Sequence, residues 1–582
     1  MSEKLTQVIE RHWAKFSAHK IKGAEILWLE GDAASDSNIG SVNNIQAKFL
    51  FENAYAVRTT EIFSNVDFDL NDSLELTAER YGGEGVGANG GGGRCGNTKQ
   101  YQLKGIGANC MVGDHGDLTH RHGGLDAPLA IIETIYTNLF SKILPLGTVK
   151  IRGLILTGGE AFYHHPANRC WGVIMVRDHC IRPAHFMRAA GFKPQPEFMS
   201  QLISDMPRIR NINKQLAAYF NDDNQFIKFI GNYLDCCAKQ FGFAQAARIM
   251  HGALTPSNIT IDGKWLDLPL SSMLPGGVNY SMTSEFYTES AAPLKYALEL
   301  LHNYAKYNGT VFSPEPLANY YNKTLDGYFR HHLGFAVGLK SDVIESCNAE
   351  LWTKLADTLS RVINSGKYLE TKWPDLSEDD PVFALIAALY IATTRPQEAA
   401  PYFDQAGISK IEVPAIIEAF RNIIKHAVRV ERSIDAKADL SLEGFVIGAA
   451  LTALKRTCLA ALFYITRVDK NVWELCREKT PYDIAALIDS YNDLATWIFE
   501  DDRGIVTLFL SARLSVTFNQ NDCTYTSRLD GHDSKHKSFV GLFVALGMVA
   551  KELMEINGFS FQPFFRKLSK IVPLLERTKY EV

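Results

Sequence analysis

An asparagine and an aspartate near the middle of the chain have the types and spacing to share a metal ion. Asn258 and Asp267 flank the dipeptide Asp262-Gly263, which favours a two-residue type I′ turn because both turn positions need positive φ. Pairing across such a turn places Asn258 directly opposite Asp267, with Cβ atoms about 4.5–5.5 Å apart. Mg²⁺ takes oxygen ligands and completes its shell with water and phosphate. An ordinary surface hairpin has the same residues, so the metal interpretation depends on the rest of the chain.

A glycine-rich segment indicates an anion site. Nine of the fifteen residues from 82 to 96 are glycine, where average usage predicts about one. Glycine has the largest entropy cost of ordering, so packing does not explain the segment. Backbone N–H groups that close around an anion do explain it. The loop residues that we expect to bind a nucleotide are Gly90, Gly91, Gly92, Gly93 and Arg94.

The order of the next segments favours a kinase-like phosphate site. A Rossmann site needs an apolar strand before the loop and a helix after it, and the flanking sequence supplies neither; a Walker Gly-Lys-Ser/Thr is also absent. A kinase-like site needs the loop, then a strand with a lysine, then a helix with a glutamate. Residues 101–104 form a strand-like run that ends in Lys104, and the helical pattern of residues 127–144 contains Glu133. A solvent-facing strand lysine is the alternative interpretation of Lys104.

Two arginines follow the next predicted strand, Trp171 to Val176. Arg177 directly follows that strand, and Arg182 lies five residues further on. The planar guanidinium fork suits phosphate, and structural salt bridges are the alternative role for both residues.

Taken in order, these segments resemble the SelO-type pseudokinases, protein adenylyltransferases that transfer AMP from ATP to protein hydroxyls. The resemblance covers residues 75–275, and the helical remainder only in character. Residues 101–107 resemble the family's Leu-Lys-Gly-x-Gly, residues 181–186 its Ile-Arg-x-Gly-His-Phe, and residues 251–258 its His-Gly-Val-Met-Asn-Thr-Asp-Asn. Asp267 lies where the family has the aspartate of Asp-Tyr-Gly.

The resemblance implies ATP and Mg²⁺ or Mn²⁺ as cofactors and a role for each matched residue. It implies that Lys104 contacts ATP phosphates and that Glu133 orients Lys104. Arg177 and Arg182 would hold the terminal phosphates of a nucleotide bound in the flipped orientation. The residues implied as metal ligands are Asn258 and Asp267.

The chain departs from the family at the expected catalytic acid. Ser257 stands where the family has an aspartate, and Leu268-Pro269 stands where it has Tyr-Gly. A serine is no base at neutral pH, although general-base help is typically worth only about 10²–10⁴-fold and nucleotidyl transfer depends mostly on positioning and charge.

Three functional hypotheses therefore stay open. The first is a Mg-ATP-dependent transferase that moves AMP to a hydroxyl of a protein or peptide, with a phosphotransferase as its close variant. The second is an ATP-binding pseudoenzyme or scaffold without turnover. The third and weakest is a metal-dependent hydrolase that uses loop histidines, whose spacing resembles no ligand set: His115, His120, His122, His164 and His165.

The net charge and the apolar segments of the chain indicate which classes of partner to expect. The net charge is −5 and no basic stripe is sustained, so we expect no nucleic-acid partner. The N-terminus lacks the apolar core of a signal peptide. The most apolar long run, Phe445 to Thr466, is interrupted by Lys455-Arg456, too costly for a membrane span, and we interpret it as a buried helix. We expect a cytoplasmic protein without a membrane partner; the oligomeric state is open.

The distribution of glycine along the chain indicates which kinds of element hold these residues in position. Of 43 glycines, 30 precede residue 300, so the first half reads as strands and loops and the second as helices. Among the strands we expect Ala24 to Leu29 and Ile45 to Phe51. We predict an α+β protein with a protein-kinase-like two-lobed fold and a large helical C-terminal region. Its expected parts are an N-terminal lobe (1–176), a C-lobe core (177–300) and the mainly helical remainder (301–582).

Overall fold

The structure is a computed structural model that describes most of the chain. The described residues are 3–31, 39–58, 62–63, 65–114, 121–162, 168–202, 205–273, 288–364, 380–434, 440–500 and 504–576.

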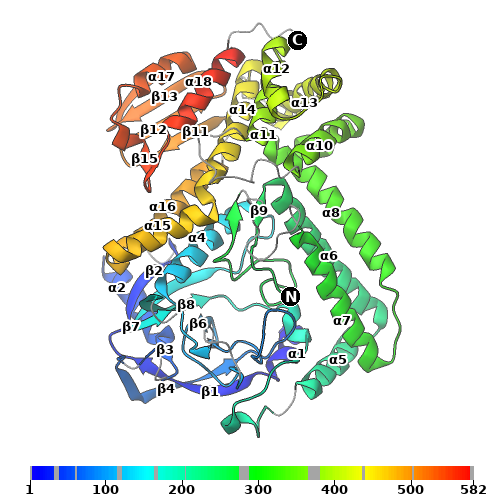
Figure 1. Cartoon of the computed structure of the whole chain (residues 1–582), viewed down its shortest axis with the longest axis vertical. Helices are drawn as coiled ribbons and strands as arrows, with labels where there is room; N and C mark the ends of the chain where they lie inside the picture. Colours follow the sequence, from blue (N-terminus) through cyan, green and yellow to red (C-terminus); the bar gives the residue numbers. More distant parts are fainter. Residues whose placement is uncertain are drawn as a thin grey trace.

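An antiparallel sheet of eight strands forms the N-terminal part (Figure 1). In spatial order the strands are β2 (Glu25–Leu29), β7 (Ile151–Phe162), β8 (Arg169–Arg177), β6 (Gln102–Lys104), β5 (Cys95–Asn97), β4 (Phe68–Ala78), β1 (Ala14–Ile21) and β3 (Tyr55–Ala56). The predicted strand Ala24 to Leu29 is therefore confirmed as β2. The central strand β8 contains Val173 to Val176, all fully buried, which accounts for its continuous apolar run. The three residues of β6 pair with β5 on one side and β8 on the other.

The predicted strand Ile45 to Phe51 is wrong, because this segment lies in helix α2 (Ile39–Asn53). Its less exposed side chains are residues 45, 46, 49, 50 and 53, whereas residues 47, 48, 51 and 52 are exposed. That alternation has the period of a helix rather than of a strand. The run of apolar residues Phe49, Leu50 and Phe51 concealed the helical period.

Helix α4 (Ala127–Ile143) lies between the sheet and two helices of the C-terminal half, α15 (Ile465–Glu478) and α16 (Pro481–Phe499). Its first turn is capped by the Asp126 side chain, which accepts a hydrogen bond from the Leu129 N–H at 3.1 Å. Nearly all its residues are buried, since it contacts β8 as well as both helices. This packing fixes the position of Glu133, in the middle of α4.

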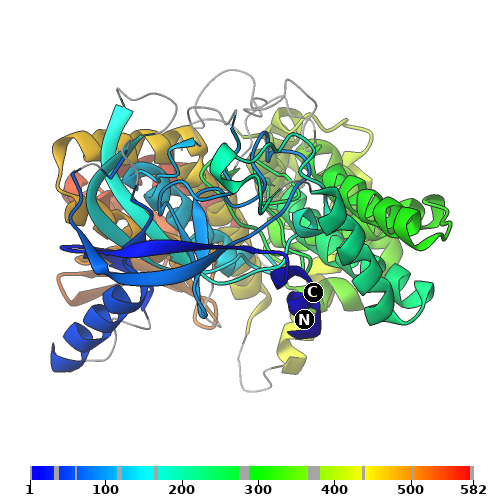
Figure 2. The same cartoon turned by 90° about the horizontal axis from the view of Figure 1, so that it is seen from below.

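Helices make up most of the rest of the chain, as the sequence predicted. Figure 2 shows α5 to α8 on the side of the molecule opposite the N-terminal sheet. The remaining helices are α1 (Glu3–Glu10), α5 (Met206–Phe220), α6 (Asp223–Ala246), α7 (Ala292–Asn308), α8 (Glu315–Ala336), α9 (Ser341–Ser346), α10 (Ala349–Ile363), α11 (Pro381–Ala392), α12 (Pro396–Gln405), α13 (Val413–Ile434) and α14 (Leu442–Leu459).

A second antiparallel sheet, of four strands, lies near the C-terminus. It consists of β11 (Ile505–Leu510), β12 (Leu514–Asn519), β13 (Thr524–Leu529) and β14 (His532–His536), in that order. A short hairpin, β15 (Glu555–Ile556) and β16 (Phe559–Ser560), and helices α17 (Phe539–Leu546) and α18 (Gln562–Glu576) complete this region. The polar residues of β14 are almost all exposed, so no apolar alternation marked it as a strand.

The most apolar long helical segment, Leu442–Phe463, belongs to the protein core. It is the one described segment long and apolar enough to cross a membrane, and 94% of its most apolar window is buried inside the protein. Its buried side chains share one apolar cluster with Leu5 and Leu575, near the two ends of the described chain. The interpretation of this run as a buried helix is confirmed.

Candidate functional site

A cavity of about 260 Å³ brings together most of the residues that the sequence analysis selected. The glycine-rich loop contributes Gly91, Gly92, Gly93 and Arg94; β6, α4 and the end of β8 contribute Lys104, Glu133 and Arg177; the segment after α6 contributes Ser257, Asn258 and Asp267. These residues come from five separate parts of the chain.

Lys104 and Glu133 form a buried ion pair at the back of the cavity. The Lys104 Nζ lies 2.7 Å from Glu133 Oε2, and each side chain is only 2% exposed. Lys104 is fixed because β6 pairs on both sides, with Cys95 on β5 and Met175 on β8. The solvent-facing interpretation of Lys104 is therefore wrong, and the lysine and glutamate lie together as their order in the sequence indicated.

Asp267 and Arg177 extend this ion pair into a network. Lys104 also donates a hydrogen bond to Asp267. The Arg177 Nη1 lies 3.4 Å from Glu133 Oε1 and 3.8 Å from Asp267 Oδ1. Asp267 has a φ of +60°, in the left-handed region that aspartate tolerates better than most residues.

The electrostatics of the cavity favour an ionised Asp267 and an anionic ligand. Burial by itself raises the pKa of the Asp267 carboxyl. The positive charges of Lys104 and Arg177, with a further contribution from Arg94, outweigh burial and hold that pKa well below its usual value. The charged lining residues are three cations and two carboxylates, so the lining has an excess positive charge that suits phosphate.

The predicted register of the hairpin is wrong by one residue. Ile259 bridges Trp265, and the Leu266 N–H donates to the Asn258 carbonyl at 3.2 Å, so Asn258 faces Leu266 rather than Asp267. The Gly263 N–H donates to the Thr260 carbonyl at 3.0 Å, and only Gly263 of the dipeptide has positive φ. The loop is thus a three-residue turn that ends in a left-handed glycine, a common alternative to the type I′ turn.

Asn258 and Asp267 nevertheless both line the cavity, with oxygens that suit a hard cation. The Asn258 Nδ2 donates to the Ala253 carbonyl at 2.8 Å, which orients the amide and leaves Oδ1 to accept from the Ser257 hydroxyl at 3.1 Å. Within the described residues no three His, Cys, Asp or Glu side chains cluster in a way that could hold a metal. An ion here would therefore need phosphate or water oxygens as further ligands, which is how proteins usually bind Mg²⁺.

Arg182 does not line the cavity, contrary to its predicted contact with phosphate. Its side chain is 1% exposed. Its Nη1 donates to the Ser257 carbonyl at 3.1 Å and its Nη2 donates to Gln102 Oε1 at 3.1 Å, and the group also lies 3.4 Å from Glu79. Arg182 therefore supports the segment that contains Ser257 from behind.

Gly90 also lies outside the cavity lining. Its N–H donates to the Met111 carbonyl at 2.8 Å, and a Cβ there would meet the Phe192 ring at 2.6 Å. Gly91 does line the cavity, with φ +145°, and a Cβ there would lie 2.0 Å from the Glu79 carbonyl oxygen. Only glycine allows the loop to approach the Glu79 carbonyl, just after β4, this closely.

Two buried residues that the sequence analysis missed connect the arginines. Gln102 Oε1 accepts from Arg177 Nε at 2.8 Å as well as from Arg182, and Gln102 Nε2 donates to Glu79 Oε1 at 2.6 Å. Burial opposes ionisation of Glu79, but the charge of Arg182, with further contributions from His185 and Arg177, outweighs burial and lowers the pKa of Glu79 to about 2. Spacing could have identified Gln102, because it lies two residues before Lys104 and therefore on the same face of the strand.

His251, which opens the segment that resembles the family motif, is structural. It is fully buried, its Nε2 lies 3.1 Å from the Asn258 carbonyl oxygen, and burial lowers its pKa to about 4. A neutral imidazole can donate to that carbonyl and so fix the backbone beside Asn258. Of the loop histidines, only His122 belongs to the described residues, and it is buried against Phe162; the other four lie outside them.

Comparison with protein-family models gives no match for this chain, and comparison with curated proteins gives none either.

Proposed function

We propose that this protein is a Mg-ATP-dependent nucleotidyltransferase that moves AMP from ATP to a hydroxyl group of a protein or peptide. The observation that carries the proposal is one network, Lys104–Glu133 with Asp267 and Arg177, in a cavity covered by a glycine-rich loop. In this proposal the N-terminal sheet and α4 are the upper lobe of a protein-kinase-like fold, and residues 177–300 are the core of the lower lobe.

The lining residues have different roles in binding a triphosphate. The loop from Gly91 to Gly93 supplies backbone N–H groups, and the cations Arg94, Lys104 and Arg177 neutralise phosphate charge. Glu133 holds Lys104 in place through their 2.7 Å contact. Asn258 and Asp267 would hold the metal ion, which when bound supplies charge neutralisation at the phosphates.

An ATP-binding protein without turnover is the second candidate, and Ser257 is the observation that favours it. The Ser257 hydroxyl contacts the Thr255 hydroxyl at 2.9 Å and the Asn258 amide oxygen at 3.1 Å. Both partners are neutral, so neither can activate the hydroxyl as a base. In this candidate the cavity binds nucleotide for regulation only.

Labelled ATP distinguishes the reactions. The full chain is incubated with Mg²⁺ and ATP labelled either at the α or at the γ phosphate, with the chain itself and casein as acceptors. Nucleotidyl transfer predicts protein label from the α position only, and label from the γ position alone identifies a kinase instead. Thermal stabilisation by ATP without any label transfer identifies the second candidate.

A matched pair of variants locates the activity. Asp267→Ala removes the carboxylate that contacts Lys104 and is expected to abolish transfer and Mg²⁺-dependent ATP binding. Asp262→Ala, in the same hairpin, removes a carboxylate that is 49% exposed and pairs with Lys264 at 3.7 Å, and is expected to retain both. Equal loss in the two variants would show that the hairpin is only structural.

A further inference from the structure

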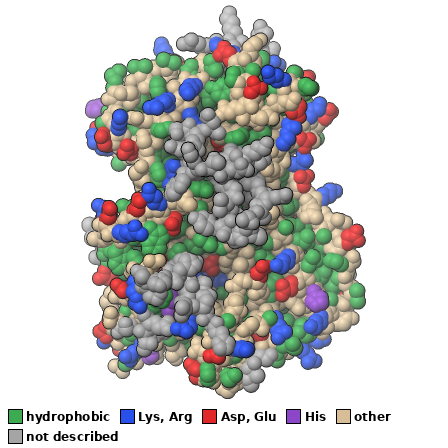
Figure 3. Space-filling view, in the orientation of Figure 1, with side chains coloured by type: hydrophobic (Ala, Val, Ile, Leu, Met, Phe, Trp, Pro, Cys, Tyr) green, Lys and Arg blue, Asp and Glu red, His purple; other side chains and the backbone are tan. Residues whose placement is uncertain are grey.

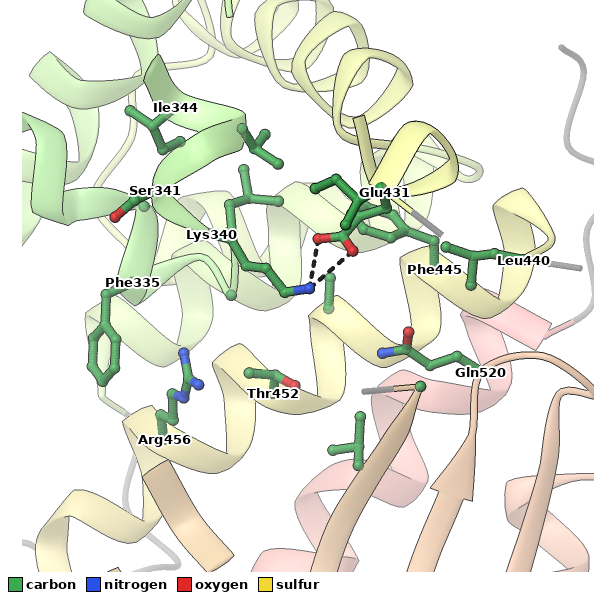
Figure 4. Close-up of a pocket in the computed structure, with 18 of the residues that line it drawn as sticks. Phe335, Lys340, Ser341, Ile344, Glu431, Leu440, Phe445, Thr452, Arg456 and Gln520 are labelled. Carbon is green, nitrogen blue, oxygen red and sulfur yellow. Dashed lines mark hydrogen bonds and ion pairs between the residues drawn. The ribbon is translucent and has the colours of Figure 1, made fainter. Parts of the chain in front are cut away.

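A second, larger cavity lies in the C-terminal half of the protein. It has a volume of about 440 Å³ and shares no lining residue with the candidate nucleotide cavity. Its walls come from α8, α9, the end of α13, one face of α14 and the β11–β12 part of the C-terminal sheet (Figure 4). Its volume lies within the range of small-molecule sites, roughly 300–1,000 Å³.

One face of α14 forms the floor of this cavity. Phe445, Ala449, Thr452 and Arg456 all line it, at spacings of four, three and four residues that place them on one side of a helix. The helix is otherwise buried. This explains why a mainly apolar core helix carries a hydroxyl and a guanidinium on the same side.

The neutral polar lining residues include Thr452 and Gln520. Thr452 is 6% exposed, and the Gln520 side chain packs over Gly448 of α14. Within the described part of the chain neither side chain has a hydrogen-bond partner, although both line the cavity. In Figure 4 both lie along the lower border of the cavity, with Arg456 beyond Thr452. Polar groups in a roomy site require water or a ligand as partners.

The charged lining groups favour an anion. Lys340 and Glu431 pair with each other at 2.7 Å. Arg456 lies over the Phe335 ring, 4.5 Å from its centroid, and donates to the Phe499 carbonyl at 3.1 Å. Burial lowers the pKa of His332 to about 4, so this imidazole is neutral at pH 7. The lining thus holds two permanent cations and one carboxylate.

We propose that this cavity binds a small organic acid with an apolar body. Its carboxylate accepts hydrogen bonds from the Thr452 hydroxyl and the Gln520 amide, close to the positive charge of Arg456. Its apolar body lies against Phe335, Phe445 and other apolar lining residues. The combination of an apolar wall with a few converging polar groups is the usual composition of a small-molecule site.

Binding of decanoate to the full chain tests the proposal, with decanol and decyltrimethylammonium as probes of the same chain length. Calorimetry is expected to detect decanoate, with decanol and the cation at least tenfold weaker, because a hydrogen bond to a charged group is stronger than one between neutral groups. Decanol binding as tightly as decanoate would overturn the recognition of an acid, and no decanoate binding at millimolar concentration would overturn the site.

Substitutions of lining residues test where the ligand binds. The double variant Thr452→Val with Gln520→Leu keeps the volume of both side chains and is expected to weaken decanoate binding about tenfold or more. Ala449→Phe fills the floor of the cavity and is expected to abolish binding. Thr457→Val, a buried threonine of the same helix outside the cavity lining, is the control and is expected to bind decanoate normally. Unchanged binding in the double variant would overturn the proposal even if Ala449→Phe does not fold.

Discussion

The Lys104 ammonium lies 2.7 Å from the Glu133 carboxylate, with both side chains 2% exposed. The two residues come from different elements, β6 and α4, so the contact ties the sheet to the helix that packs on it. Both charges are removed from water, and a buried charge is tolerated only when it is paired. Their contact is therefore essential to the stability of this region as well as to the proposed nucleotide site.

Breaking this pair is expected to destabilise the protein strongly. Glu133→Gln keeps the shape of the side chain but removes its charge, and it should lower the free energy of unfolding by about 3–5 kcal/mol. Urea unfolding followed by circular dichroism measures the change. The control is Glu75→Gln, which breaks the exposed Lys15–Glu75 pair (2.8 Å, side chains 69% and 62% exposed) and should cost about 1 kcal/mol or less. Similar losses in both variants would contradict this account.

Acid is expected to weaken the protein through Glu79. Its pKa is lowered to about 2 in the folded protein, from 4.5, so the unfolded chain binds this proton more readily. The stabilisation is therefore present in full above pH 4.5 and is lost as the pH falls towards 2. For one group this amounts to about 3 kcal/mol. Unfolding free energies across this range should fall less steeply in Glu79→Gln, and parallel curves would contradict the prediction.

That the glycine-rich loop, Lys104 and Glu133 belong to one site could be predicted from the sequence, because each lies in a segment with a local signal. A glycine-rich loop, a strand with Lys104 and a helix with Glu133 are each marked by composition or period. The contact of Arg182 with the Ser257 carbonyl and Gln102 joins segments far apart in the chain, and no local pattern distinguishes a phosphate-binding arginine from a buried structural one. The position of Arg182, five residues after the strand that ends in Arg177, was therefore misleading.

Two of the three Asp-Gly dipeptides of the chain, Asp262-Gly263 and Asp530-Gly531, show why the hairpin register was missed. Asp530-Gly531 has positive φ at both residues and joins β13 to β14 with Leu529 opposite His532, as a two-residue type I′ turn requires. Asp262-Gly263 has the same sequence but a longer loop. There the Ile261 N–H donates to the Ile181 carbonyl at 2.9 Å, so a tertiary contact accompanies the different turn.

Alanine substitution is expected to destabilise the protein more at Gly263 than at Gly531. Gly263 and Gly531 have similar φ values, +83° and +86°, so alanine should cost each about 1–2 kcal/mol through the left-handed backbone. At Gly263 the added Cβ would also lie 2.7 Å from a Leu146 methyl, whereas at Gly531 nothing lies within 4 Å. Urea unfolding should therefore show a larger loss for Gly263→Ala. An equal loss would indicate that the hairpin moves away from Leu146 at little cost.

Substitution of Ser257 distinguishes catalysis by positioning from catalysis by a general base. If AMP transfer depends on positioning and charge, Ser257→Ala should reduce the transfer rate far less than the roughly 10²–10⁴-fold that removal of a general base costs. Lys104→Ala removes a buried cation of the cavity and should cost at least about 10²–10³-fold. Lys99→Ala, an exposed lysine just before β6, is the control and should be neutral. Rates with α-labelled ATP measure all three.

A loss in Ser257→Ala as large as that in Lys104→Ala would mean that the hydroxyl takes part directly in the reaction. The proposed mechanism would then have to include Ser257 as a reacting group, because its two contacts with neutral oxygens do not by themselves explain such a loss.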